Sequence, residues 1–150
     1  ERWRRALRMQ GLAGAALEHA LQQVLENIAA SLCADGPGRW ILSPAHAQAR
    51  SEWPLVMLDG EGRPRTLVID RSFVDVATGE RWIVDYKTSR PLAGESLTVF
   101  CAREAEAYRE QLAGYRDALA ALGPEPVRCA LFFTALGELH ELGDLALAAR

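Results

Sequence analysis

The chain has 150 residues, of which 49% are hydrophobic and 25% are charged, so it contains enough apolar material for one domain with a single core. Its formal net charge of −3 excludes the overall basic character of a free-standing nucleic-acid-binding domain. A polyanion that binds this chain must therefore be attracted by local charge or by a metal ion.

The cysteines Cys33, Cys101 and Cys129 are far apart and odd in number, which argues against a disulfide framework, a zinc knuckle and an iron–sulfur cluster. No apolar run approaches the ~18 residues of a membrane span, and nothing resembles a signal peptide. We therefore expect a cytoplasmic protein without membrane contact. Because the chain opens on Glu1 without a methionine, we also expect a fragment of a longer protein.

The first elements expected along the chain are a helix and a strand. Apolar positions at helical spacing predict an amphipathic helix over 11–33, followed by a loop or short helix over 39–48. The segment 51–58 (SEWPLVML) predicts a strand, and 59–64 a turn rich in glycine and charge.

A β-hairpin is predicted next, from strands over 65–76 and 81–88. If Thr78 and Gly79 are its two loop residues, Ala77 pairs with Glu80, and Asp70 lies opposite Lys87.

A loop over 91–100, a helix over 103–122 and strands over 127–136 and 138–142 complete the prediction. The order α-β-β-β-α-β-β describes a sheet with helices packed on it, of α/β or α+β class.

The hairpin contains a candidate site. Asp85 and Lys87 share one strand face because side chains alternate, and the predicted register places Asp70 on that face, diagonal to Asp85. Two aspartates on an apolar sheet would repel, and burial would raise their pKa values unless a cation lay between them. Lys87 is the only lysine in the chain, and its ammonium is a more compact point charge than a guanidinium.

These residue types favour metal-assisted phosphodiester hydrolysis. Mg²⁺ binds one or two carboxylates, backbone oxygen and waters, and it can activate a water for attack on phosphorus. Lys87 would orient that water or stabilise the developing negative charge. The alternative is an ordinary solvated hairpin, since D-x-K spacing is common. The apolar runs before Asp70 and Asp85 favour the site, because charges are seldom placed in buried strands.

Three segments, VIDRSFVD, WIVDYKTS and YREQLAGYRDAL, together resemble the PD-(D/E)XK nuclease domain of RecB- and AddA-type (UvrD/Rep-like) helicase–nucleases. The resemblance covers about 51–136, with the motifs in the family's order. It implies an α/β, restriction-endonuclease-like core, in which a central mixed β-sheet carries a β-hairpin active site and helices flank it. The single domain 1–150 would then comprise an N-terminal helical part of about 1–50 and a nuclease core of 51–142.

The resemblance also implies the site residues by matching positions. Asp70 and Asp85 would bind Mg²⁺ or Mn²⁺, Tyr86 would contribute its backbone carbonyl, and Lys87 would assist catalysis. The resemblance further implies roles for Gln111 and Tyr115, which match the family's Q-x-x-x-Y motif, and for the accessory acid Glu52 on the first core strand. The alternative for Tyr115 is a plain core residue.

One departure concerns the metal-binding histidine that family members usually carry in an upstream G-x-x-x-H helix. Gly14 is followed by His19, one residue too far, and His19 is expected to be solvated. We expect the true histidine to precede Glu1, so that this fragment binds metal weakly.

The resemblance implies a DNA exonuclease domain acting in double-strand break repair and recombination. A motor elsewhere in the parent chain would use ATP and deliver single-stranded DNA, together with a partner subunit of the RecBCD or AddAB type. No phosphate-binding loop motif occurs in this sequence. The alternatives are a stand-alone RecB-like nuclease and a non-catalytic relative that grips a DNA end or docks a partner. Candidate phosphate contacts are the arginines near the hairpin in sequence, Arg63, Arg65, Arg71, Arg81 and Arg90.

Overall fold

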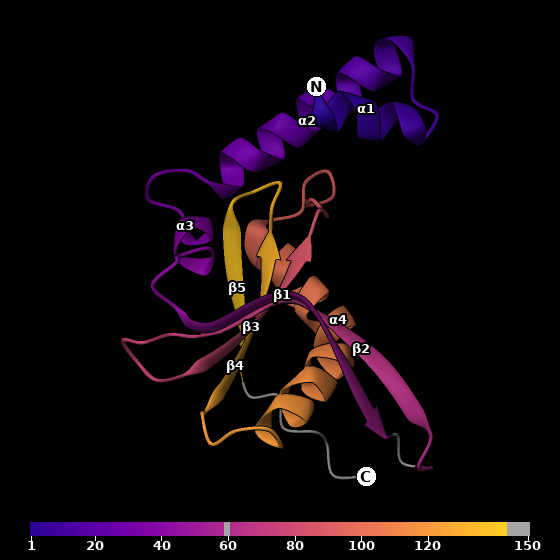
Figure 1. The fold of residues 1–150 in the computed structure, drawn as a ribbon. Coiled ribbons are helices and arrows are strands. Elements are labelled where there is room, and N and C mark those ends of the chain that lie inside the picture. The colour runs from indigo at the N-terminus through magenta and orange to yellow at the C-terminus, as the bar shows by residue number, and fades with distance from the viewer. Residues whose placement is uncertain (59–60, 144–150) are drawn as a thin grey trace.

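A five-stranded mixed β-sheet with helices packed against it forms the body of the molecule (Figure 1). The computed structural model describes residues 1–58 and 61–143; the first two residues of the turn predicted over 59–64 lie outside that range. The elements are α1 Arg2–Met9, α2 Gly14–Ser31, α3 Pro37–Ile41, β1 Ala47–Leu58, β2 Pro64–Val74, β3 Arg81–Lys87, α4 Leu97–Ala120, β4 Val127–Phe133 and β5 Glu138–Leu142. The predicted α/β class is therefore confirmed.

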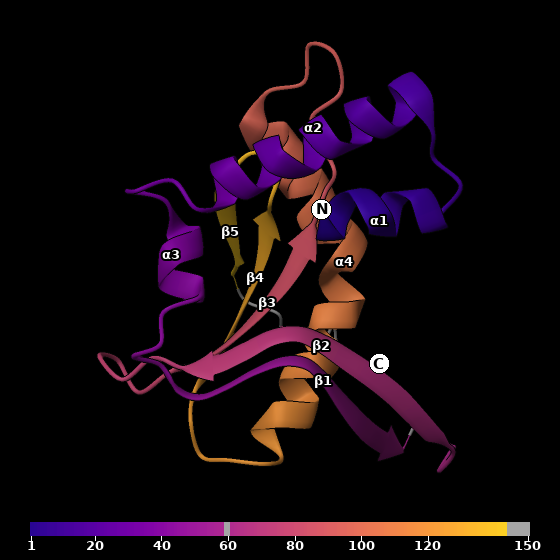
Figure 2. The same cartoon turned by 45° about the horizontal axis from the view of Figure 1, so that its top comes forward.

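The strands follow the order β1-β2-β3-β4-β5, and β3–β4 is the parallel pair in an otherwise antiparallel sheet. A parallel pair cannot be closed by a tight turn and needs a crossover connection. Helix α4 provides it, and Figures 1 and 2 show α4 running along one side of the strands. The connectivity thus brings α4 against the strand that carries Asp85 and Lys87.

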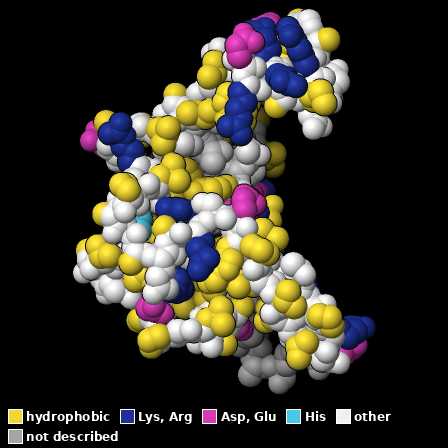
Figure 3. All heavy atoms as spheres, in the orientation of Figure 1, with side chains coloured by type: hydrophobic (Ala, Val, Ile, Leu, Met, Phe, Trp, Pro, Cys, Tyr) yellow, Lys and Arg dark blue, Asp and Glu magenta, His cyan; other side chains and the backbone are white. Residues whose placement is uncertain are grey.

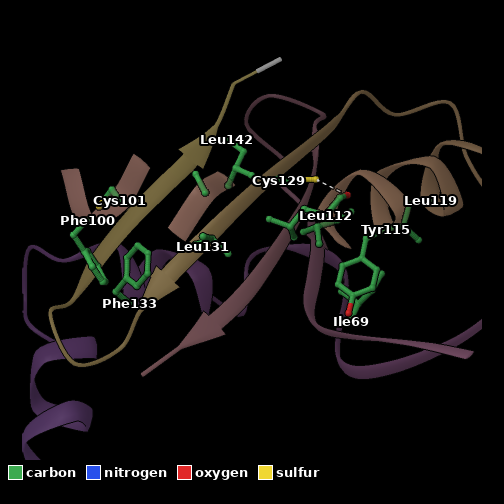
Figure 4. Close-up of a cluster of buried hydrophobic side chains, with 12 residues drawn as sticks. Ile69, Phe100, Cys101, Leu112, Tyr115, Leu119, Cys129, Leu131, Phe133 and Leu142 are labelled. Carbon is green, nitrogen blue, oxygen red and sulfur yellow. Dashed lines mark hydrogen bonds between the residues drawn. The ribbon is translucent and has the colours of Figure 1, made fainter. Parts of the chain in front are cut away.

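Two apolar clusters lie on the two faces of the sheet. Ile83 packs with α4 residues in one cluster, shown in Figure 4, whereas Trp82 and Val84 pack with Ile41 of α3 in the other. In Figure 4 Tyr115 lies beside Ile69, which extends the α4 cluster onto β2. The alternation predicted for β3 is confirmed.

The predicted hairpin register was wrong by two residues. The observed pairs run from Arg71↔Val84 to Val74↔Arg81, so Asp70 does not lie opposite Lys87. Asp75 is the reason: its N–H donates to the Glu80 carbonyl (2.9 Å), and its carbonyl accepts from Gly79 (2.7 Å), which closes a longer loop. A shift of two residues does not by itself exchange the two faces of a strand, because side chains alternate with a period of two.

Helix α4 begins at Leu97, six residues before the predicted start and inside the predicted loop over 91–100. The Ser96 hydroxyl accepts a hydrogen bond from the Val99 N–H (3.3 Å) and caps the first turn. Strand β1 likewise begins earlier, at Ala47, with Gln48 and Glu52 at positive φ and an irregular register near its start. The last strand, β5, has the predicted bounds.

Helices α1 and α2 extend from the body as an arm (Figures 1 and 2), and α1 was not predicted. The C-terminal end of α2 is anchored, since the Ser31 hydroxyl donates to the Thr134 carbonyl after β4 (3.1 Å). Among the described residues, no helix is both long and apolar enough to cross a membrane.

We predict that Gly38→Ala destabilises the protein by about 1–3 kcal/mol, because a Cβ at Gly38 would lie 1.9 Å from the Ser31 carbonyl oxygen, which is backbone and cannot rotate away. Gly114→Ala is the matched control: it lies in α4 with nothing within 4 Å of the added Cβ, and should stabilise by about 0.5–1 kcal/mol. Urea unfolding measures both; equal effects of the two substitutions would contradict the close approach of α3 to α2.

Candidate active site

Asp85 lies near the end of β3 and is 4% exposed. Its Oδ1 accepts a hydrogen bond from Gln111 Nε2 of α4 (3.1 Å), and its Oδ2 lies 2.5 Å from the Lys87 ammonium. Apart from that charge contact, Oδ2 is buried without a hydrogen-bond partner among the described residues. The carboxylate is therefore held at one oxygen by an amide and faces a cation with the other.

Burial raises the pKa of Asp85 above its ordinary value, and the negative charge of Asp70 raises it further. The contact with Lys87 and the hydrogen bond from Gln111 oppose this rise. Desolvation, one part of the sequence-based expectation, is therefore found at Asp85, whereas the cation between the two aspartates stays a prediction.

Asp70 meets β3 through its side chain. Its Oδ2 accepts a hydrogen bond from the Tyr86 backbone N–H (2.9 Å), beyond the last registered pair of the two strands, Arg71↔Val84. The N–H and C=O of a residue in an extended strand point to the same side, so the Tyr86 carbonyl also points toward β2. Asp70, Asp85 and the Tyr86 backbone are thus gathered at one place, although the ligand role of the carbonyl stays a prediction.

Lys87 is fixed at its backbone and contacts two groups with its side chain. Its carbonyl accepts hydrogen bonds from the backbone N–H (2.9 Å) and the hydroxyl (3.2 Å) of Thr134. Its ammonium lies 3.5 Å from the centroid of the Tyr108 ring while also contacting Asp85. Tyr108 was not among the predicted site residues; the signal that could have identified it is its i, i+3 spacing to Gln111.

Gln111 and Tyr115 join the site to the core. Tyr115 belongs to the core, as the alternative interpretation expected, and its catalytic role stays a prediction. The Gln111 amide donates to Asp85 and to the Tyr115 hydroxyl (2.9 Å), and that hydroxyl donates to the Val68 carbonyl (2.9 Å). The Tyr115 ring is buried in the α4 cluster, and burial raises the pKa of its hydroxyl. A chain of hydrogen bonds therefore runs from β2 through α4 to Asp85.

Two further polar residues, Ser89 and Glu104, hold the segment after Lys87 in place, and neither was identified from the sequence. The Ser89 hydroxyl donates to Glu104 Oε2 (2.7 Å), and Glu104 is only 7% exposed. Arg103 forms an ion pair with Glu104 at 2.5 Å. The hydrogen bond between Ser89 and Glu104 therefore connects the segment after β3 to the first half of α4.

The metal-ligating set is small. Across residues 1–58 and 61–143, no three His, Cys, Asp or Glu side chains are grouped so that they could hold a metal ion. Mg²⁺ does not require three, because one or two carboxylates, a backbone oxygen and waters complete its octahedral shell. The buried Oδ2 of Asp85, Asp70 and the Tyr86 backbone fit such an ion.

Glu52 and His19 are not brought into this group. Glu52 is exposed and has a φ of 49°. Its negative charge contributes to the raised pKa of Tyr86, and the Tyr86 ring packs on the α3 side of the sheet. His19 is exposed on α2, in agreement with its expected solvation.

The five candidate arginines have different surroundings. Arg65 is exposed, and Arg63 pairs with Glu61. The other three arginines bond to protein groups: Arg71 to the Ile41 carbonyl, Arg81 to Gln48 and Glu125, and Arg90 to Asn27. Arg81 is buried, which excludes it as an exposed phosphate contact.

A different basic surface lies on α1. Figure 3 shows basic side chains gathered at the end of the arm, over α1, and all of those on α1 are arginines. The helix contributes Arg2, Arg4, Arg5 and Arg8, of which Arg4 pairs with Glu18 and the other three are exposed. This local positive charge contrasts with the net charge of −3 for the whole chain.

A cavity of about 510 Å³ lies on the α3 side of the sheet, between that face and helices α1 and α2. The ring of Tyr86 reaches it, but its lining contains neither carboxylate nor basic side chain. The two faces of β3 therefore differ: one carries the charged group of Asp85 and Lys87, and the other borders an apolar cavity.

We predict that Tyr115→Phe lowers the free energy of unfolding by about 1–2 kcal/mol, because the Val68 carbonyl and the Gln111 amide each lose a hydrogen-bond partner. Tyr108→Phe, whose hydroxyl has no hydrogen bond among the described residues, is the control and should change stability little. Chemical denaturation of both variants measures the difference, and equal losses would show that the Tyr115 hydroxyl has no structural role.

No family model matches the chain, and no curated protein matches it in sequence.

Proposed function

We propose that this chain is a Mg²⁺- or Mn²⁺-dependent deoxyribonuclease domain of PD-(D/E)XK type with a restriction-endonuclease-like core. The observation that carries the proposal is the hydrogen bond from Gln111 to Asp85. These residues come from two separate motifs of the resemblance, on a helix and a strand, and they meet beside Lys87 and Asp70. The mixed sheet, its hairpin and the helices on both faces support the same assignment.

Each residue has a role in the proposed hydrolysis. Asp70, Asp85 Oδ2 and the Tyr86 carbonyl would hold the ion, which supplies Lewis-acid activation of a water and of the phosphate when bound. Lys87 places an ammonium where negative charge develops on the phosphate oxygens. Gln111 fixes Asp85 through Oδ1 and so keeps Oδ2 directed at the ion.

The biological setting proposed is a bacterial RecB/AddA-like helicase–nuclease that acts in double-strand break repair and recombination. Single-stranded DNA would arrive from the motor, and a partner subunit of the RecBCD or AddAB type would complete the assembly. A stand-alone nuclease would use the same site. The exposed arginines of α1 support DNA binding under each arrangement, including a non-catalytic relative that only grips a DNA end.

We predict that the intact protein that contains this chain degrades single-stranded DNA when Mn²⁺ or Mg²⁺ is added, and that Lys87→Ala and Asp85→Asn each lower the rate at least about 100-fold, because each removes transition-state charge stabilisation. Glu106→Gln, an exposed carboxylate of α4 that pairs with Arg109, is the matched control and should retain activity. Release of labelled nucleotides measures all four proteins.

Two results would count against the nuclease proposal. One is full activity of the Lys87→Ala protein; the other is DNA that stays intact with every divalent ion while the intact protein still binds it, which would favour the non-catalytic relative.

We also predict that the triple variant Arg2→Gln, Arg5→Gln, Arg8→Gln binds single-stranded DNA more weakly in EDTA. Three lost phosphate contacts should reduce the slope of log affinity against log salt by about 2, since each contact to a single strand contributes about 0.7. Fluorescence anisotropy at several salt concentrations measures this slope, and the variant Arg128→Gln, a partly exposed arginine paired with Glu80 and Glu141, is the control. An unchanged slope would remove α1 from the DNA interface.

A further inference from the structure

The ammonium of Lys87 lies between a buried carboxylate and an aromatic ring. Nζ is 2.5 Å from Asp85 Oδ2 and 3.5 Å from the Tyr108 ring centroid, and the Lys87 side chain is 16% exposed. The backbone cannot follow a moving side chain freely, because Thr134 bonds the Lys87 carbonyl twice. Any displacement of the ammonium must therefore come from rotation of the lysine side chain.

The oxygen that the ammonium contacts is the one a metal ion needs. Oδ1 of Asp85 already accepts from Gln111, whereas the Lys87 ammonium is the partner of Oδ2. A magnesium ion would approach Oδ2 to about 2.1 Å. Two cations at such distances from one oxygen repel strongly, and the repulsion is larger in a buried site than in water. The ammonium and the metal ion therefore compete for Asp85.

We propose that Lys87 is an internal counter-ion, which occupies Asp85 Oδ2 until a divalent metal ion displaces it, and that the Tyr108 ring retains the displaced ammonium beside the metal. The inference rests on the proposed function, because it assumes a metal at Asp85. Tyr108 acts through Lys87 and is a positioning residue: its ring attracts the cation without competing for the metal.

This arrangement has two consequences. Before metal binding, the buried charge of Asp85 is compensated from within the strand, so the site does not need an ion to fold. After metal binding, Lys87 is already held next to the ion, where a phosphate oxygen of the substrate would arrive. The same side chain thus serves the empty and the loaded site in turn.

The competition is tested by Mn²⁺ binding to the 150-residue chain without DNA, measured by isothermal titration calorimetry. Lys87→Met and Lys87→Gln should bind Mn²⁺ about tenfold more tightly than the unmodified chain, because the competitor is gone. Arg109→Met removes a positive charge from α4 that pairs with Glu106 and should leave the affinity unchanged, which controls for net charge. Circular dichroism verifies that the variants are folded.

The outcomes separate this inference from the proposed function. If the unmodified chain binds Mn²⁺ and both lysine variants bind equally or more weakly, the competition is overturned while the proposed metal site stands. If neither the chain nor any lysine variant binds Mn²⁺, both proposals are overturned. Binding by the lysine variants alone would support the competition in its strongest form.

Retention by Tyr108 is tested by NMR, since a chain with one lysine labelled at ¹³Cε gives one lysine signal. The Hε protons of Lys87 should be shifted upfield by the Tyr108 ring, move when Mg²⁺ is added, and remain upfield of free lysine. Tyr108→Phe should preserve this shift and Tyr108→Leu should abolish it. A signal that Mg²⁺ leaves unchanged at saturation overturns displacement, and one that Mg²⁺ moves to the free-lysine position overturns retention.

Discussion

The buried negative charge of Asp85 is the constraint around which this part of the structure is arranged. A carboxylate that is 4% exposed loses most of its hydration, and protein groups must compensate for that loss. Compensation comes from two elements, an amide on α4 and an ammonium two residues along β3. A second carboxylate, Asp70, adds repulsion instead of relief. An ion pair between Asp85 and Lys87 does not require Asp70, whereas a site for a divalent cation would use a second carboxylate as a ligand.

The sheet topology explains how these groups meet. The parallel pairing of β3 with β4 requires a crossover, and α4 is that crossover, so the helix must lie against the strand that precedes it. Apolar residues at helical spacing then fix which side of α4 faces the sheet. Tyr108, Gln111 and Tyr115 share that side, and their polar ends fall at the carboxyl end of β3. The site is therefore a consequence of the same packing that forms the core.

The hairpin register shows how far local sequence signals reach. The strand alternation was predictable, because it depends only on neighbouring residues, and it correctly placed Asp85 and Lys87 on one shared face. The loop was not, because Thr78-Gly79 is a reasonable two-residue turn and only the hydrogen bonds of Asp75 reveal the longer one. A register error of two residues leaves the alternation of side chains unchanged but gives each residue a different partner on the neighbouring strand. Asp70 consequently contacts the Tyr86 backbone, and the predicted pairing with Lys87 is absent.

The sequence by itself determined the mixed class of the fold, the order of most elements, the shared face of Asp85 and Lys87, and the helical spacing of Gln111 and Tyr115. All of these follow from local periodicity, which the chain carries in every short segment. The tertiary structure alone decided that Gln111 bonds Asp85, that Tyr108 lies under the Lys87 ammonium, and that Glu52 and Arg81 are placed elsewhere. These are contacts between residues far apart in sequence, and they depend on how the strands and helices pack, which no local pattern encodes.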